Sequence, residues 1–196
     1  MSRLAMGGSE PVGWQRLMPF PAQEQQSPPD LDLFGALERR GNGLDLRFRL
    51  QGDLDQLLLP EASAAPARCD GLWQHTCLEA FWGACGEPGY WEWNASPSGD
   101  WNLYRFDRYR QGLRPQPLAQ PPRCHWMLGS AAAGGQQLEL QLELPDLAEA
   151  AVPAGALEAS LTAVLEHRDG SLSYWALAHP GPEPDFHRRD GFVLRL

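Results

Sequence analysis

Four polar or charged side chains lie among a dense group of aromatic rings in residues 71–110. This stretch holds five of the eight tryptophans and three of the four tyrosines, and its polar members are Glu79, Glu92, Asn94 and Arg105. A ring can cover the apolar face of a pyranose while carboxylate and amide groups bind its hydroxyls. We therefore predict a site for a small polar ligand such as a sugar. The rings expected beside these groups are Trp73, Trp101 and Tyr104.

The alternation of side chains along residues 90–94 separates a core face from a binding face. Successive side chains of a strand point to opposite sides of the sheet. Trp91 and Trp93 therefore share one face, and Tyr90, Glu92 and Asn94 share the other. We expect the two tryptophans to pack in the core. The opposite face then presents a ring, a carboxylate and an amide side by side.

Glu79 has two interpretations. Residues 73–82 are predicted to form a strand with apolar residues on both faces, and Glu79 lies inside it. A carboxylate in such surroundings is either paired or has a raised pKa. It could bind a ligand or a metal ion, or it could form a buried ion pair with Arg105 on a neighbouring strand. The sequence leaves both possibilities open.

A second group of candidate residues lies near the C-terminus. The loop HPGPEPDFHRRDG (179–191) contains His179, Asp185 and His187. Together with His75 these residues could form a metal or haem site. The alternative is that they cap turns and pair with the two arginines of the same loop.

Two aromatic residues lead directly into this loop. Tyr174 and Trp175 are neighbours on a predicted strand, so one ring lies on each face of the sheet. A binding patch could therefore combine one of these rings with His179 and His187.

Composition and charge argue against several functional classes. The chain has 196 residues, a net charge of −9 and no concentrated basic patch, which disfavours nucleic acid and anionic membranes as partners. No apolar run approaches the ~18–20 residues of a membrane span, and no secretory signal is recognisable, so we expect a cytoplasmic protein. The four cysteines form no C-x-x-C pair and are expected to be reduced thiols.

An enzymatic function is not indicated by any familiar motif. The sequence lacks G-x-S-x-G, Walker, H-E-x-x-H and G-x-G-x-x-G patterns. Glu79 and Glu92 could in principle act as the acid and base of a glycosidase, which needs two carboxyls roughly 5–10 Å apart. Glu79 is expected to be too buried for that role. We therefore predict a protein without catalytic activity.

The elements that must position these residues are predicted to be strands. Residues 31–38 and 44–50 flank an Asn-Gly turn, and LDLRFRL (44–50) alternates between apolar and charged residues. Further strands are expected at 17–20, in residues 71–110 as a three-stranded meander, and at 124–129, 137–144, 157–166, 172–178 and 191–196. We predict an all-β fold, an antiparallel β-sandwich of about ten strands with little helix, formed by residues 17–196 after a loose tail at 1–16.

The chain resembles the DOMON-like proteins, a group related to family 9 carbohydrate-binding modules. The resemblance covers about residues 17–196 and depends on the ordered segments WQHTCLEAF (73–81), YWEWNASPSGDWNLYRFDRYR (90–110), and SYWALAHP with PDFH (173–187). It implies a β-sandwich that binds a ligand. Some members of this group hold sugars between tryptophans, often with calcium stabilising the fold, and others hold b-type haem through Met and His.

The sequence departs from both kinds of relative. No acidic cluster suited to calcium stands out. The only methionine outside the first 18 residues is Met127, with His125 nearby. Our first hypothesis is therefore a non-catalytic module for a small carbohydrate or similar polar ligand, with no cofactor. The alternatives are a haem-binding redox module that uses Met127 and a His, and a structural or interaction domain without a small ligand. The sequence does not indicate an oligomeric state.

Overall fold

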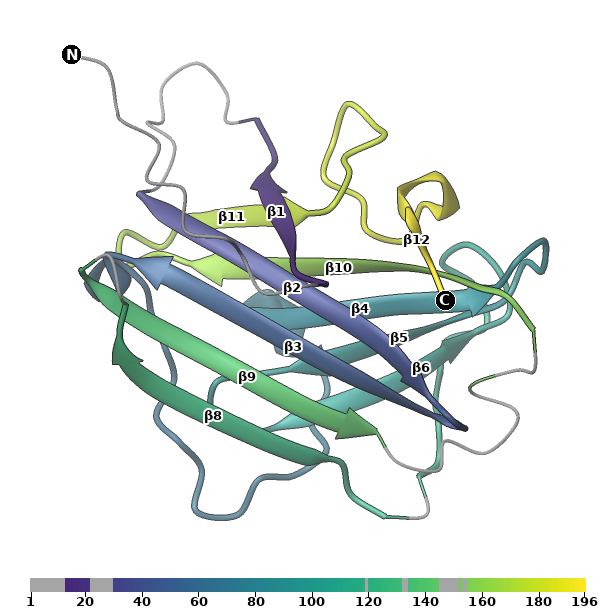
Figure 1. Ribbon diagram of the computed structural model, residues 1–196, viewed down its shortest axis with the longest axis horizontal. Coiled ribbons are helices and arrows are strands. Elements are labelled where there is room, and N and C mark those ends of the chain that lie inside the picture. The colour runs from purple at the N-terminus through teal and green to yellow at the C-terminus, as the bar shows by residue number, and fades with distance from the viewer. Residues whose placement is uncertain (1–12, 22–29, 119, 132–133, 145–151, 153–154) are drawn as a thin grey trace.

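The protein is built almost entirely from antiparallel strands. The computed structural model describes residues 13–21, 30–118, 120–131, 134–144, 152 and 155–196 (Figure 1). The first six strands in it are β1 (Gln15–Pro19), β2 (Leu31–Arg40), β3 (Gly43–Gly52), β4 (Cys77–Ala84), β5 (Tyr90–Ala95) and β6 (Trp101–Phe106). The other six are β7 (Arg114–Pro115), β8 (Arg123–Ser130), β9 (Gln136–Leu144), β10 (Leu157–Glu166), β11 (Leu172–Ala176) and β12 (Leu194–Arg195).

Three single-turn 3-10 helices complete the described secondary structure. They are η1 (Leu54–Gln56), η2 (Leu72–Gln74) and η3 (Arg189–Gly191). Within the described ranges, no helix is long and apolar enough to cross a membrane.

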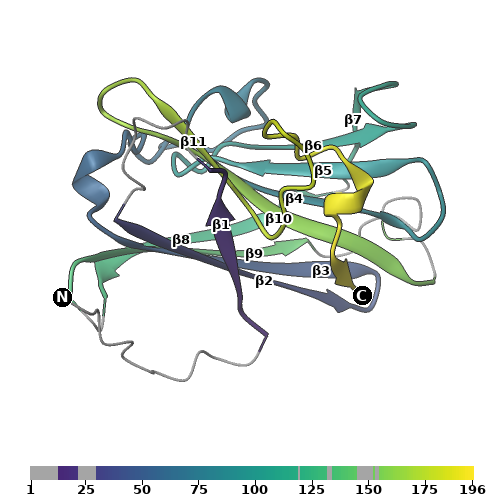
Figure 2. The same ribbon diagram turned by 90° about the horizontal axis from the view of Figure 1, so that it is seen from above.

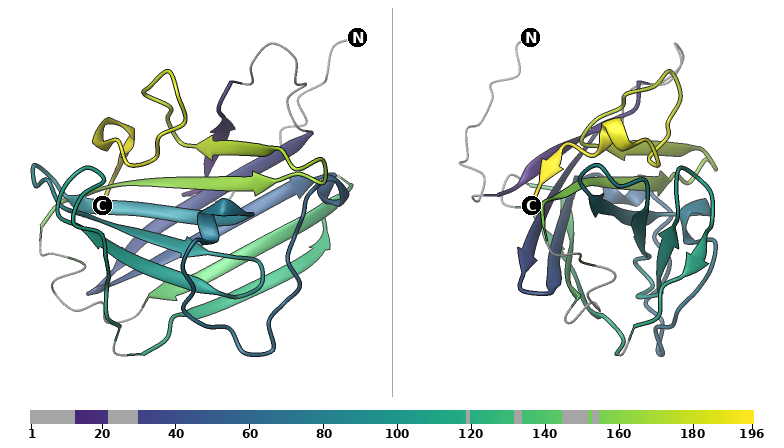
Figure 3. Two further views of the ribbon diagram at one scale, coloured as in Figure 1. Left: turned by 180° about the vertical axis from the view of Figure 1, so that it is seen from behind. Right: turned by 90° about the vertical axis from the view of Figure 1, so that its right-hand side faces the viewer.

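All strands belong to one continuous sheet that curls over on itself. The strand order is β7-β6-β5-β4-β10-β11-β1-β2-β3-β9-β8, and β12 pairs with β10. We call β2, β3, β9 and β8 the front half, and β4–β7 with β10–β12 the back half (Figures 1 and 3). Strand β1 joins the halves, because Leu17 pairs with Leu33 of β2 while Met18 pairs with Ala176 of β11.

The main core lies between the two halves and follows the alternation of the sequence. Leu44, Leu46, Phe48 and Leu50 of β3 are buried in it, and their charged neighbours face outward. The back half contributes Trp82, Trp91, Trp93, Leu161 and Trp175. The expected packing of Trp91 and Trp93 in the core is confirmed. Large aromatic rings bury more apolar area than other side chains, so they stabilise such a core strongly.

The outer face of the back half is covered by a second layer. Phe186 and Phe192, from the segment that follows β11, pack on Phe81 of β4 and Tyr90 of β5. Figure 2 shows this C-terminal segment crossing above β10 and β4. Side chains of the outer face that would otherwise contact water are therefore buried.

Arginine 189 anchors the covering segment to the sheet. Its guanidinium donates to the Glu158 carboxylate of β10 at 2.8 Å and to the Ala84 carbonyl of β4 at 2.9 Å. It also donates to the Gly89 carbonyl at 3.2 Å. A Cβ on Gly83 would lie 2.1 Å from this guanidinium, so glycine is required where the arginine crosses β4.

The predicted all-β, antiparallel class is confirmed, and so are the hairpins at 31–50 and 124–144 and the meander of β4, β5 and β6. The predicted sandwich would consist of two separate sheets, whereas β1 joins both halves into one continuous sheet. The sandwich therefore stays a prediction. Some predicted boundaries were wrong. Strand β4 begins at Cys77 rather than at Trp73, so Trp73 lies in η2, and β1 begins at Gln15 rather than at residue 17.

Candidate functional site

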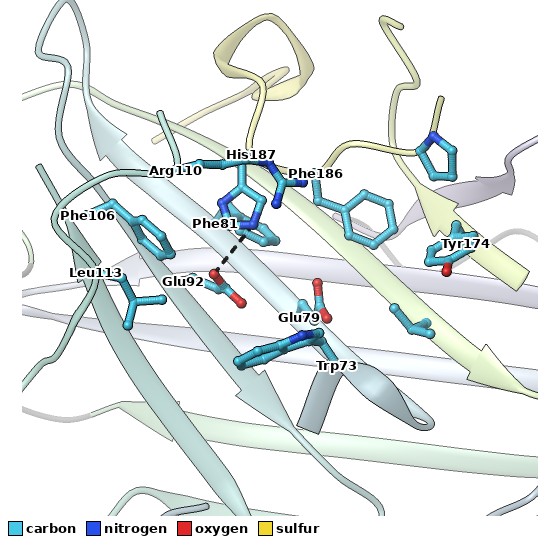
Figure 4. Close-up of a pocket in the computed structure, with 12 residues that line it drawn as sticks. Trp73, Glu79, Phe81, Glu92, Phe106, Arg110, Leu113, Tyr174, Phe186 and His187 are labelled. Carbon is cyan, nitrogen blue, oxygen red and sulfur yellow. Dashed lines mark ion pairs between the residues drawn. The ribbon is translucent and has the colours of Figure 1, made fainter. Parts of the chain in front are cut away.

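A pocket opens on the outer face of the back half, on the side opposite the main core. Its cavity volume is about 350 Å³. Strands β4 and β5 supply the floor, and the loops after β6 and β11 supply the walls (Figure 4). The lining residues are Trp73, Glu79, Phe81, Glu92, Phe106, Arg110, Leu113, Val164, Tyr174, Pro184, Phe186 and His187.

The register of β4 and β5 brings two carboxyl groups to the floor. Phe81 lies opposite Glu92, and Glu79 lies opposite Asn94. Glu79, Phe81 and Glu92 therefore point to the same side of the sheet, away from Trp82 and the other core tryptophans. The Asn94 amide donates to Glu92 Oε1 at 2.7 Å and fixes the orientation of that carboxyl group.

Glu79 is buried without an ionic partner. Its side chain is 2% exposed; the Thr162 hydroxyl donates to Oε2 at 3.1 Å, and Oε1 has no hydrogen-bond partner. Burial raises its pKa well above the usual range, and the nearby Glu92 raises the pKa further. The ion pair with Arg105 suggested as one alternative is wrong. Arg105 lies on the opposite face of the sheet, 3.9 Å above the ring of Trp91.

Glu92 and His187 meet at the centre of the pocket. His187 Nε2 lies 3.9 Å from Glu92 Oε2. Burial raises the pKa of Glu92 to about 7, against the opposing effects of Asn94 and Arg110. Burial lowers the pKa of His187 to about 4, and Arg110 lowers it further, so the imidazole is neutral at pH 7. The Tyr90 hydroxyl shares a hydrogen bond of 2.8 Å with His187 Nδ1 and holds the ring in place.

Arg110 forms the cationic side of the pocket. It is the one non-glycine residue among those described with a positive φ, 51°, and its backbone N–H donates to the Tyr90 hydroxyl at 3.1 Å. This uncommon conformation directs its guanidinium to Asp185, at 2.9 Å. Tyr109 also donates to Asp185, at 2.5 Å. Two loops that are distant in sequence are thereby joined over the pocket.

An exposed tryptophan stands at the rim. Trp73 is 39% exposed, although it is a large apolar residue, and its ring meets Tyr104 edge-on at a centroid distance of 5.9 Å. The Tyr104 hydroxyl donates to Asp70 at 2.6 Å and receives a bond from Asn102 at 2.7 Å. A ring that is fixed from behind and open in front offers a flat surface to a ligand.

The structure brings together eight of the thirteen predicted site residues. Five line the pocket: Trp73, Glu79, Glu92, Tyr174 and His187. Three support its lining through the contacts given above: Asn94, Tyr104 and Asp185.

The other five predicted site residues are placed elsewhere by specific contacts. His75 bonds Glu166 at 2.8 Å, and His179 bonds the Met18 carbonyl at 2.8 Å. The remaining three, on the core-facing side of their strands, are Trp101, Arg105 and Trp175.

Several lining residues escaped prediction from the sequence. Phe81 and Phe106 lie two residues from Glu79 and Tyr104, so strict alternation along β4 and β6 would have included them. Arg110 and Phe186 come from loops, where no periodicity indicates which way a side chain points. Only the proximity of Phe186 to Asp185 and His187 in the sequence hinted at its position.

The Met and His residues suggested for haem do not form a haem pocket. Met127 and His125 lie on the outward face of the edge strand β8, where the Met127 side chain is 53% exposed, rather than in an enclosing pocket. Within the described ranges, no group of three or more His, Cys, Asp or Glu side chains could hold a metal ion.

Comparison with known proteins gives a structural likeness and no sequence relative. No protein-family profile and no curated protein sequence matches the chain. A solved structure described as a "putative carbohydrate-binding protein" from Bacteroides uniformis superposes with a TM-score of 0.65 at 13% identity, covering 91% of this chain and 83% of that one. The chain shares the fold of this protein. At so low an identity, the likeness establishes the fold alone.

Two further solved structures are family 9 carbohydrate-binding modules from Caldicellulosiruptor kristjanssonii. The complex with cellotriose has a TM-score of 0.43 at 13% identity, covering 85% of this chain and 72% of that one. The complex with glucose has a TM-score of 0.40 at 12% identity, covering 89% and 81%. This weaker likeness carries no functional argument.

Proposed function

We propose that the protein is a non-catalytic module that binds a small carbohydrate or a similar polar ligand in the pocket on the outer face of the back half. The observation that carries this proposal is the combination of exposed Trp73 with the polar groups of Glu92, Arg110 and His187 around one cavity. Cavities of this size, mostly apolar with a few convergent polar groups, are typical ligand sites. A kinship with DOMON-like proteins is part of the proposal.

The chemistry of the two carboxyls favours binding over catalysis. A glycosidase needs one carboxyl kept protonated and another kept ionised, through environments that push their pKa values apart. Here burial raises the pKa of both Glu79 and Glu92. Neither carboxyl is held in the ionised form by a close cation. We therefore propose that both groups bind rather than react.

Location and partners form the remaining part of the proposal. We propose a cytoplasmic protein whose partner is a small molecule, and neither nucleic acid nor a membrane. The net charge of −9 and the four free cysteines support this proposal.

The decisive experiment is calorimetric titration with a panel of mono- and disaccharides. We expect at least one sugar to bind. We expect Trp73→Ala to weaken that binding roughly tenfold or more, because ring contact with a sugar face is lost. Trp14→Ala is the matched control: Trp14 lies under the guanidinium groups of Arg47 and Arg49, outside the pocket. A folded protein that gives no heat with any sugar would refute the proposal, as would equal affinities of the two variants.

A further inference from the structure

One oxygen atom at the floor of the pocket lacks a hydrogen-bond partner, although the neighbouring Cys77 thiol lowers the pKa of the same carboxyl. Glu79 Oε1 is buried and accepts no hydrogen bond, although the side chain lines the cavity. A buried polar atom without a partner costs free energy, and for a carboxylate the cost is large. Nearly all buried polar groups in proteins are satisfied, so an exception that faces a cavity points to a group supplied from outside.

The groups already present around Glu79 and Glu92 supply little positive charge. The Thr162 hydroxyl and the Asn94 amide are neutral donors to the two carboxyls. Arg110 is the only permanent cation in the described lining, and it already binds Asp185 with its side chain half exposed. The titratable groups packed around the two carboxyls are Cys77 of β4, Tyr90 of β5, Tyr104 of β6, Arg110 of the loop after β6, and Asp185 and His187 of the loop after β11.

None of the remaining groups supplies positive charge at neutral pH. Burial raises the pKa of Cys77 well above its usual value, so the thiol stays neutral. Burial raises the pKa of Tyr90 to about 12 and holds that of His187 at about 4, so both are neutral as well. Glu79 and Glu92 therefore lie side by side without a cation that would favour their ionised forms, and the pKa values of both are raised.

The rings around the carboxyls favour the same kind of ligand group. Trp73 and Phe81 line the cavity next to Glu79 and Glu92, and Tyr174 lines its far side (Figure 4). The faces of aromatic rings attract cations, most strongly where water is excluded. Carboxyls backed by rings form a site suited to an ammonium group.

We propose that the ligand carries a protonated amine, which is held by Glu79 and Glu92 while the body of the ligand lies against Trp73. The class most compatible with the pocket is an amino sugar, and a non-sugar primary amine shares the same chemistry. This inference rests on the proposed function, because it assigns the ligand to the same cavity. It goes further in naming the group that Glu79 binds.

Binding of an ammonium group is coupled to loss of protons from the carboxyls. In the free pocket the pKa of Glu92 is about 7, so the group is largely protonated below that pH. A bound cation favours the carboxylate form. Affinity for an amine that stays protonated therefore rises as the pH increases through 7, and binding at pH 6 releases protons to the buffer.

The test is calorimetric titration at pH 7 with D-glucosamine, D-glucose and benzylamine, which separate the amine from the sugar. The variants are Glu79→Gln and Glu92→Gln, which keep the side-chain size and remove the charge. Glu143→Gln, on the outer face of the front half, is the matched control. We expect glucosamine to bind roughly tenfold or more tightly than glucose, because a hydrogen bond to a charged group is the stronger kind. Each pocket variant should abolish that difference, and the control should preserve it.

The outcomes separate this inference from the proposed function. Equal affinities for glucosamine and glucose, with no binding of benzylamine, would overturn the inference and leave the sugar-binding proposal standing. Binding of benzylamine alone, lost in Glu79→Gln, would support the ammonium site and refute the sugar ligand. Absence of binding by all three compounds, with normal thermal unfolding of the protein, would overturn the ammonium site, and the proposed function would then be decided by the full panel of sugars.

Discussion

Glu92 connects the stability of the protein to the chemistry of its pocket. The carboxyl group accepts a hydrogen bond from Asn94 and faces His187 across 3.9 Å, yet it is buried without a cation in direct contact. Such an arrangement costs stability in the ionised state. A protein retains a costly group of this kind most readily where a ligand compensates for it.

The pH dependence of stability follows from the direction of this pKa shift. The pKa of Glu92 is about 7 in the folded protein and near its ordinary value of 4.5 when unfolded. The group therefore stabilises the fold fully below pH 4.5, and this contribution is lost as the pH rises through 7. Glu92→Gln cannot ionise, so its free energy of unfolding relative to wild type should improve by about 3 kcal/mol between pH 4.5 and 7.5.

Urea unfolding at a series of pH values measures this difference. Glu143→Gln is the control, because its carboxyl is partly exposed on the outer face of the front half, where it pairs with Arg123 at 3.4 Å. Parallel curves for wild type and Glu92→Gln across this pH window would contradict the assignment.

At the scale of elements, the pocket depends on the segment that crosses the outer face of the back half. This segment has almost no regular secondary structure and carries Phe186 and His187 into the pocket wall. Arg189 attaches this segment to the sheet, because it binds the Glu158 carboxylate and two backbone carbonyls. One side chain therefore positions a wall that the strands alone do not form.

Replacing Arg189 by methionine should loosen this wall. Glu158 would remain partly buried with Arg195 as a more distant partner at 3.6 Å, and two carbonyls would lose a donor. We expect a loss of roughly 2–4 kcal/mol in the free energy of unfolding and faster proteolysis within residues 177–188. Arg188→Met is the matched control, since Arg188 is partly exposed and binds Asp190, away from Glu158. Similar unfolding and cleavage rates for the two variants would show that Arg189 does not anchor the segment.

At the scale of the whole molecule, a single short strand holds the two halves in one sheet. Strand β1 pairs with β2 on one side and with β11 on the other, as Figure 1 shows. Leu17 in this strand is fully buried in the main core, whereas the adjacent Met18 is 50% exposed. We therefore expect Leu17 to contribute much more than Met18 to the free energy of unfolding.

Leu17→Ala should destabilise the protein by about 2–4 kcal/mol, because it leaves a cavity where the two halves meet. Met18→Ala should change the free energy of unfolding by less than about 0.5 kcal/mol. Urea unfolding followed by tryptophan fluorescence measures both. Equal effects, or unfolding of the halves in separate transitions in wild type, would contradict the role given to β1.

The strands and their inner faces were predictable from local sequence. Alternation along 44–50 and 90–94 identified the buried side chains, since the pleat of a strand places alternate residues on opposite faces wherever it lies in the fold. The turns followed from Gly, Pro and Asn-Gly. Glu79 and Glu92 were predicted to be unusual for the same reason, because their neighbours in sequence are apolar.

The position of the pocket depended on contacts that no local pattern encodes. Alternation separates two faces but does not say that residues 177–193 cover one of them, nor that Glu79 lies beside Thr162, 83 residues away. Arg105 illustrates the limit, since its type suggested a partner for Glu79 and its register turned it to the opposite face. Strand periodicity depends only on residues that are neighbours in the chain, so it can be predicted from the sequence. The pocket is made where distant strands and aperiodic loops meet, so it exists only once the sheet has curled and its outer face has been covered.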